Sequence, residues 1–234
     1  MKPRFLFTAM ALCFLPLTTE AAGVFYSFDT VPDGTGNFTT AATTEIGLTG
    51  TSTFTRNGSV VSIDSNGGWT STAAQNISGI EWTGDGGTGE PGHSAAINPG
   101  SVGNSYSLTL PTTALSQMFV SFDYRYAGAP ANPAFTSFTY SINGGTAQAV
   151  PGADLSLSAS SPSSVFNQWS MDLGGLTAIE NQSSVTLTWN LPDFGGGQSF
   201  RMDNLQVVAV PEPSAAFLST VAAVMLAGRR RRRK

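Results

Sequence analysis

Apolar and polar residues alternate with a period of two along several segments, and this pattern restricts the fold more than any other feature of the chain. Residues 118–126 are the clearest case, with one apolar face made of Met118, Val120, Phe122, Tyr124 and Tyr126. The other face carries Ser121, Asp123 and Arg125. Because successive side chains of a strand point to opposite sides, this alternation predicts a strand that is buried on one face.

The same pattern recurs further along the chain, whereas helical periodicity is almost absent. Alternating apolar residues occur in three more segments: Phe138, Tyr140 and Ile142; Val165, Trp169, Met171 and Leu173; and Val185, Leu187 and Trp189. The first of these runs into Asn143-Gly144, a dipeptide favoured in type I′ hairpin turns. Several such strands, separated by Gly, Pro, Asn and Ser, predict an all-β fold, an antiparallel β-sandwich of the jelly-roll type.

The parity of the last strand changes part-way along. Phe200 and Met202 share one face, but the next apolar residues, Leu205 and Val207, fall on the opposite parity. An extra residue near Asp203-Asn204, which is a β-bulge, would keep all four pointing inward. Alternatively, Leu205 and Val207 face a second layer, and the sequence leaves both interpretations open.

The charge of the central part of the chain excludes one class of partner. Residues 22–210 contain three arginines, no lysine and thirteen acidic residues, which gives a net charge of −10. An acidic, lysine-free domain repels phosphate backbones, so we expect no nucleic-acid binding. The Ser, Thr, Asn and Gly that dominate the remaining polar positions suit a hydrated extracellular setting and O-glycosylation.

The N-terminus has the features of a signal peptide. Lys2 and Arg4 precede an apolar segment over residues 5–17, and small residues at Thr19 and Ala21 suit cleavage after Ala21 or after Ala22. We predict a signal peptide over residues 1–21 and export through the Sec machinery. Its removal also removes Cys13, the only cysteine, so no disulfide can stabilise the remaining domain, predicted over residues 22–208.

The C-terminus combines a polar turn, an apolar segment and a basic end. Pro211, Glu212 and Pro213 precede the apolar residues 215–227, which are followed by Arg229, Arg230, Arg231, Arg232, Arg233 and Lys234. A helix of these thirteen residues is about 20 Å long, short of the roughly 30 Å hydrocarbon core of a bilayer. The alternative to a membrane-held tail is therefore a peripheral amphipathic tail, although snorkelling arginines and local thinning favour the former.

Residues 209–234 resemble the PEP-CTERM sorting signal of exported bacterial proteins. That resemblance implies recognition of the Pro-Glu-Pro motif by an exosortase, a basic membrane stop at the arginine cluster, and removal of the tail. The protein would be anchored transiently in the inner membrane and then be placed in the cell envelope or outside the cell.

From Tyr106 onward the chain is similar to jelly-roll modules of secreted bacterial proteins, which are like carbohydrate-binding modules. The similar segments are 120–125, 138–144, 169–173 and 201–204. In such modules an acidic residue of the first strand and an aspartate of the last hold a structural calcium ion. The resemblance implies that Asp29, Asp203 and Asn204 are candidate ligands here, with oxygen donors of the kind that calcium prefers.

Four tryptophans are candidates for stacking on sugar rings. Trp169 and Trp189 alternate with polar residues in predicted strands, so we expect them in the core. Trp69 and Trp82 lie in Gly-rich segments and are the candidate sugar-binding residues. An acidic stretch with Glu81, Asp85, Glu90 and the only histidine, His93, lacks the spacing of a catalytic carboxylate pair, and we predict no catalytic residues.

The sequence therefore favours a non-catalytic, exosortase-sorted protein of the envelope or extracellular matrix, with a structural or adhesive role. The alternative is a lectin-like module that binds exopolysaccharide, with or without calcium. A glycoside hydrolase is the third and least supported hypothesis.

Overall fold

The structure, a computed structural model, describes residues 22–28, 38–58, 63–67, 75–77, 80–82, 92–97, 103–127, 134–158, 166–193 and 199–211. Nearly all regular structure in these ranges is strand, and the helical part is the 3-10 turn η1 (Thr177–Ile179). In the described part of the chain, no helix is long and apolar enough to cross a membrane. The predicted signal peptide and the chain beyond Pro211 lie outside these residues.

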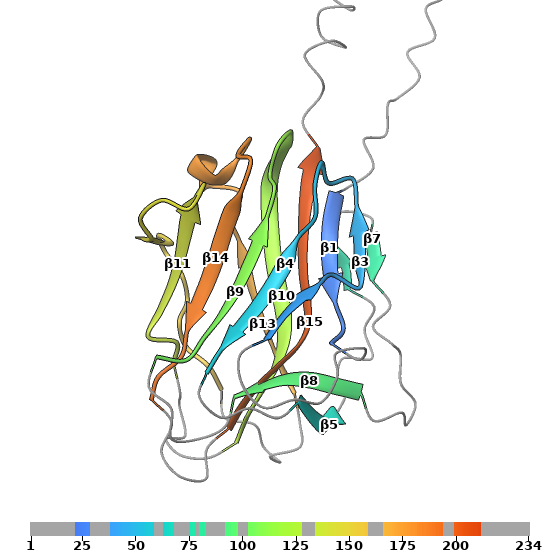
Figure 1. The fold of residues 1–234 in the computed structure, drawn as a ribbon. Helices are drawn as coiled ribbons and strands as arrows, with labels where there is room; N and C mark the ends of the chain where they lie inside the picture. The colour runs from blue at the N-terminus through green and yellow to red at the C-terminus, as the bar shows by residue number, and fades with distance from the viewer. Residues whose placement is uncertain are drawn as a thin grey trace, which may run out of the picture.

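The larger of the two main antiparallel sheets, sheet A, is built around two long strands (Figure 1). Its order is β13-β10-β15-β1-β3, with β8 paired to β15 and β5 paired to β8. The bounds are β1 (Ala22–Tyr26), β3 (Thr44–Ile46), β5 (Ile63–Gly67), β8 (Gly92–Ile97), β10 (Leu115–Ala127), β13 (Asn167–Asp172) and β15 (Ser199–Pro211).

Sheet B has the order β12-β11-β14-β9-β4-β2, and its central strands lie side by side in Figure 1. The bounds are β2 (Phe38–Ala41), β4 (Thr53–Asn57), β9 (Ser105–Leu110), β11 (Ser137–Ile142), β12 (Gln148–Ala149) and β14 (Val185–Asn190). A separate two-stranded ribbon pairs β6 (Gln75–Ile77) with β7 (Ile80–Trp82). The two main sheets pack face to face, so the predicted antiparallel β-sandwich is confirmed.

The core between the sheets is rich in aromatic side chains, as the alternation predicts. Phe122 of β10 stacks on Trp169 of β13 with ring centroids 4.9 Å apart. Across the core, Phe138 of β11 stacks on Trp189 of β14, also at 4.9 Å. Phe122 meets Trp189 edge-on at 5.6 Å and so joins the two sheets. The expectation that Trp169 and Trp189 belong to the core is confirmed.

The parity change in the last strand is a β-bulge. Ser121 pairs with Gln206 and Asp123 pairs with Asp203, so β15 has one more residue than β10 between these two pairs. Asn204 takes a positive φ of 49°, and Leu205 and Val207 remain buried in the core with Phe200 and Met202. The bulge interpretation is confirmed, and the second-layer alternative is wrong because the apolar side chains stay between the sheets.

The predicted turn at Asn143-Gly144 is also confirmed. Both residues have positive φ, 51° and 73°, and the Gly145 amide donates to the Ile142 carbonyl at 2.8 Å. These are the features of a type I′ turn. At the other end of the sandwich's sequence, β15 runs three residues past the predicted domain end at Val208, and Pro211 pairs with Leu115.

Three ionisable side chains lie inside the sandwich where β1, β4 and β9 meet. The Tyr26 hydroxyl is 2.7 Å from Ser52 Oγ, and the Tyr106 hydroxyl donates to the Ala95 carbonyl at 2.7 Å. Arg56 pairs with Tyr106 across the sheet and donates to the Ala96 carbonyl at 3.0 Å. Burial raises the pKa of both tyrosines well above the ordinary value and lowers the pKa of Arg56 to about 10.

These shifts predict loss of stability in alkali. The tyrosines stay protonated in the fold but ionise on unfolding, so above pH 10 each contributes a loss of about 1.4 kcal/mol per pH unit. Arg56 has the opposite sign, because its burial as a cation is relieved as the pH rises from about 10 to the ordinary value of 12.5. The net loss in the free energy of unfolding is therefore about 1.4 kcal/mol per pH unit above pH 10. Urea unfolding between pH 8 and pH 11.5 measures it. Tyr26→Phe should flatten the decline, and an equal decline in that variant would contradict the assignment.

Candidate functional site

Most of the residues singled out from the sequence lie at the margins of what the structure describes. Trp69 and Asp29 lie outside the described residues, as do Glu212, Pro213 and the arginines 229–233. Trp82 is the last residue of β7, which places its backbone but not its side chain. Sugar stacking by Trp69 or Trp82 therefore stays a prediction. Asp203 and Asn204 are well described, and both are buried.

Asp203 and Asn204 belong to a buried polar cluster on the side of sheet A that faces away from the core. Asp123 lies opposite Asp203 in the register of β10 and β15, and Gln206 lies opposite Ser121. The Asn204 side-chain amide donates to Asp123 Oδ2 at 3.0 Å, and its backbone amide donates to Asp203 Oδ1 at 2.8 Å. All five side chains are at least nine-tenths buried.

Two amide oxygens of this cluster have no hydrogen-bond partner. Gln206 Nε2 donates to Ser121 Oγ at 2.9 Å, which leaves Gln206 Oε1 unpaired, and Asn204 Oδ1 is likewise unpaired. A buried unpaired carbonyl oxygen is costly, so each one requires an explanation such as a bound cation. Two carboxylates and two amide oxygens are the type of donor set that suits Ca²⁺.

The neighbouring row of the same two strands carries the opposite charge. Arg125 pairs with Arg201 two residues along from the Asp123–Asp203 pair, so the four side chains sum to zero formal charge. Among the described residues, no group of three or more His, Cys, Asp or Glu side chains is placed to hold a metal ion. The cluster thus has the oxygen donors for calcium but also its own arginine counter-charges.

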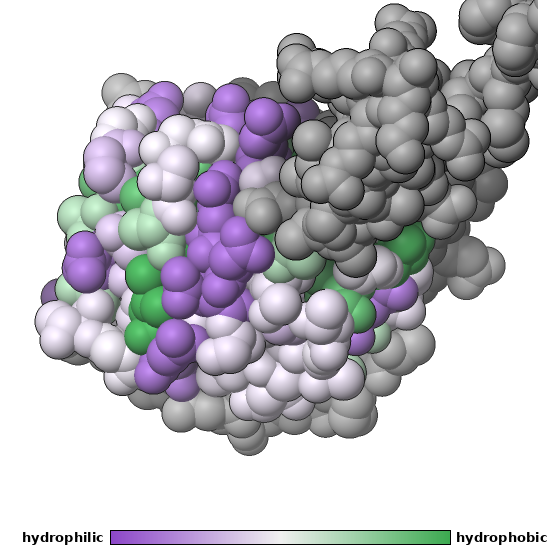
Figure 2. Space-filling model, turned by 90° about the horizontal axis from the view of Figure 1, so that it is seen from above, coloured by the Kyte–Doolittle hydropathy of each residue, from purple (hydrophilic) through white to green (hydrophobic). Residues whose placement is uncertain are grey.

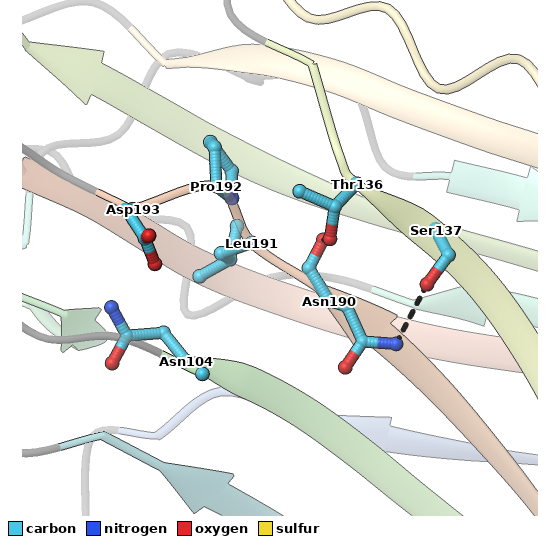
Figure 3. A pocket seen from close by; sticks show the side chains of 8 residues that line it. Asn104, Thr136, Ser137, Asn190, Leu191, Pro192 and Asp193 are labelled. Carbon is cyan, nitrogen blue, oxygen red and sulfur yellow. Dashed lines mark hydrogen bonds between the residues drawn. The ribbon is translucent and has the colours of Figure 1, made fainter.

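An open pocket of about 360 Å³ lies at one end of sheet B (Figure 3). It is formed where β9 and β11 begin and β14 ends, and Gly103, Asn104, Thr136, Ser137, Asn190, Leu191, Pro192 and Asp193 line it. Three hydrogen bonds fix its walls: Leu191 N to the Asn104 carbonyl, Thr136 N to the Asn190 carbonyl, and Asn190 Nδ2 to Ser137 Oγ, all at 2.9 Å.

The pocket combines hydrogen-bonding groups with a small apolar surface. Two amides, two hydroxyls and the Asp193 carboxylate line it together with Leu191 and Pro192. Figure 3 shows these side chains arranged around one opening, with Asn104 and Asp193 from different connections facing it. Such a mixture suits a small polar ligand with several hydroxyl groups, because amides and carboxylates both accept from O–H donors.

The opposite end of the sandwich is where β1 begins and β15 ends. Ala22 pairs with Ala209, so these two ends of the described chain lie together. Figure 2 looks onto this end and shows hydrophilic side chains gathered beside it. Asn143, Asn181 and Gln182 belong to the connections here, where Asn181 Oδ1 accepts from the Ala114 amide at 2.8 Å and Asn143 Oδ1 accepts from the Ser184 amide at 3.0 Å. Their hydrogen bonds hold the turns in place, which is a structural role.

No protein-family model matches the chain, and no curated protein matches it. Among solved structures, the fold is similar to that of TmCBM61 in complex with β-1,4-galactotriose, with 12% identity, a TM-score of 0.33 and coverage of 51% of this chain and 71% of that one. It is also similar to the CBM22-1 xylan-binding domain of Paenibacillus barcinonensis Xyn10C, with 13% identity, a TM-score of 0.37 and coverage of 81% and 95%. At these values the likeness is one of fold, and function has to be argued from the residues of this chain.

Sequence reasoning missed Asp123, Gln206 and every residue of the pocket as site residues. One signal for the cluster was present: Asp123-x-Arg125 is mirrored by Arg201-x-Asp203. In antiparallel strands such mirrored pairs come into register, which brings like residues opposite each other. The pocket has no comparable signal, because its residues come from three connections that meet only in the fold.

Proposed function

We propose that the domain is a non-catalytic, glycan-binding module of an exported protein, and that the pocket at the end of sheet B is its binding site. The observation that carries the proposal is the lining of that pocket, where Asn104, Ser137, Asn190 and Asp193 offer amide, hydroxyl and carboxylate groups. The hydrogen bonds across its walls hold these groups in place before a ligand binds, which lowers the entropic cost of binding.

The low density of positive charge agrees with this ligand class. Arg56, Arg125 and Arg201 are the three cationic side chains of residues 22–210, and each is in a strand rather than in the pocket. The pocket therefore offers no cation for a phosphate, sulfate or carboxylate, and its own Asp193 repels them. A neutral sugar is the ligand that these groups suit.

The ends of the chain give the proposed setting. A signal peptide over residues 1–21 and a Pro211-Glu212-Pro213 motif followed by an apolar segment and five arginines support export and processing by an exosortase-like enzyme. The module would then act in the envelope or matrix, where exopolysaccharide is the available ligand. Adhesion through the glycan unites this role with the structural one expected from the sequence.

Calcium is proposed as a structural ion of the same domain. Asn204 Oδ1 and Gln206 Oε1, together with Asp123 and Asp203, supply the donors, and the arginine pair alongside is the feature that opposes it. Asp29, the predicted first-strand ligand, lies outside the described residues. The ion would stabilise the bulge of β15.

The pocket makes the first prediction. Retention of the protein in affinity electrophoresis on native exopolysaccharide, on xylan and on β-1,4-galactan should fall about tenfold in association constant for Asp193→Ala, because a charge-assisted hydrogen bond to a sugar hydroxyl is lost. Thr146→Ala, an exposed change away from the pocket, is the control and should bind normally. If the unchanged protein is retained by none of these glycans, glycan binding is wrong and a purely structural role is left.

Calcium makes the second prediction. Removing calcium with a chelator should lower the melting temperature by roughly 5–10 °C, the effect expected of an ion present at about a hundred times its dissociation constant. Asp203→Ala should lower the melting temperature by itself and abolish the further effect of the chelator. An unchanged melting temperature after chelation would show that the cluster is neutralised by Arg125 and Arg201 alone.

The sorting motif makes the third prediction. Replacing Glu212 and Pro213 with alanine should leave an unprocessed, membrane-retained protein, detected by its mass in membrane fractions. These two residues lie beyond β15, so the fold should be untouched, and the melting temperature serves as the control. Normal processing of this variant would exclude recognition of the motif.

A further inference from the structure

The outer face of sheet B carries an ordered array of hydroxyl groups. The strands contribute Thr-x-Thr and similar alternations, in which the intervening residue points into the core. The register places the outward residues in two rows that cross five strands. One row is Thr39, Thr55, Ser107, Thr188 and Thr139, and the other is Ala41, Thr53, Thr109, Thr186 and Ser141.

The array is periodic in two directions. Neighbouring strands are about 4.8 Å apart, and residues two apart along a strand are separated by about 6.7 Å. A third, shorter row of Asn57, Ser105, Asn190 and Ser137 continues the array toward the pocket. Nine of the ten positions in the two long rows are therefore hydroxyl side chains on a repeating grid.

The hydroxyl groups are held in place by one another. Thr109 Oγ1 lies 2.8 Å from Thr186 Oγ1, Ser107 Oγ lies 3.1 Å from Thr188 Oγ1, and Thr39 Oγ1 lies 3.1 Å from Thr55 Oγ1. Each such pair uses one of its two protons internally. The second proton and the remaining lone pairs stay available to a ligand, so each pair presents a fixed donor and acceptors.

The array has no charge. None of the outward residues in these three rows is Asp, Glu, Lys or Arg, although residues 22–210 as a whole carry a net charge of −10. A charged ligand finds no counter-ion on this face and is repelled by the domain if it is anionic. Charge complementarity therefore selects a neutral partner that both donates and accepts hydrogen bonds.

We propose that the outer face of sheet B is a second binding surface, specific for the face of aligned, uncharged polysaccharide chains packed side by side. A ligand that repeats in two directions, as packed chains do, can engage both rows at once, whereas a single chain can follow only one. This inference rests on the proposed glycan-binding function but concerns a surface distinct from the pocket. The pocket takes a sugar end or a short segment, and the array takes the polymer surface.

The test compares solid and soluble glycans. Wild-type protein is mixed with microcrystalline cellulose, crystalline chitin and insoluble β-1,3-glucan, and the bound fraction is measured by depletion. The double variant Thr109→Val/Thr186→Val keeps side-chain shape and strand preference but removes one hydroxyl pair, so the fold should survive, as circular dichroism would verify. Binding to the retained solid should fall about tenfold. Thr146→Val, in the connection between β11 and β12, is the matched control and should bind like the wild type.

The outcomes separate this surface from the pocket. Loss of binding to the solid in the double variant, with unchanged retention on soluble glycan, supports the array. Asp193→Ala should show the reverse, so failure of the pocket leaves the array result readable. No binding of the wild type to any of the three solids, or equal binding by the double variant, overturns the proposal. Shaping of ice crystals by the wild type without polysaccharide binding would assign the array to ice and also overturn it.

Discussion

The aromatic contact between the two sheets is the interaction on which the rest of the structure depends. Phe122 and Trp169 of sheet A pack against Phe138 and Trp189 of sheet B, and no cysteine is available between residues 22 and 211 to cross-link the chain. Large aromatic side chains bury more apolar area than any others, so they can supply the cohesion that a disulfide would give. The inner faces of both sheets are thereby committed to the core, and the chemistry of the domain is left to outer faces and connections.

The bulge in β15 links the core to the polar cluster. One extra residue, Asn204, lets Met202 and Leu205 both point inward although their parities differ. The same residue brings its side-chain amide to Asp123 and its backbone amide to Asp203. A regular strand would place Leu205 on the outer face, where a buried polar cluster has no use for it. The bulge therefore satisfies the core and builds the cluster in one step.

Features set by local pattern were predictable, and features set by register were not. The alternation in 118–126 and the dipeptide Asn143-Gly144 act over a few residues, so they indicated a strand, its inner face and a turn. The opposition of Asp123 and Asp203, the pairing of Thr109 with Thr186, and the meeting of Asn104 with Leu191 join residues about 80 positions apart. Such contacts depend on which strands pair and in which register, which composition and periodicity do not specify. Trp69, Trp82 and Asp29 remain predictions, since the structure does not place their side chains.

The direction of the strands orients the proposed sites relative to the proposed anchor. β15 ends at Pro211, where it pairs with Leu115, and β9 runs from the pocket at Ser105 to Leu110, close to that same end. The pocket is therefore separated from the Pro211 end by the length of β9, roughly 17 Å for six residues. Since the sheet leads into the Pro-Glu-Pro motif with no intervening residues, a tail held in a membrane holds the domain close to it. In that orientation the pocket points away from the membrane, and the array on sheet B stands along the side of the domain. A glycan arriving from outside the cell thus meets the pocket first, and a packed polymer can lie against the array without displacing the tail.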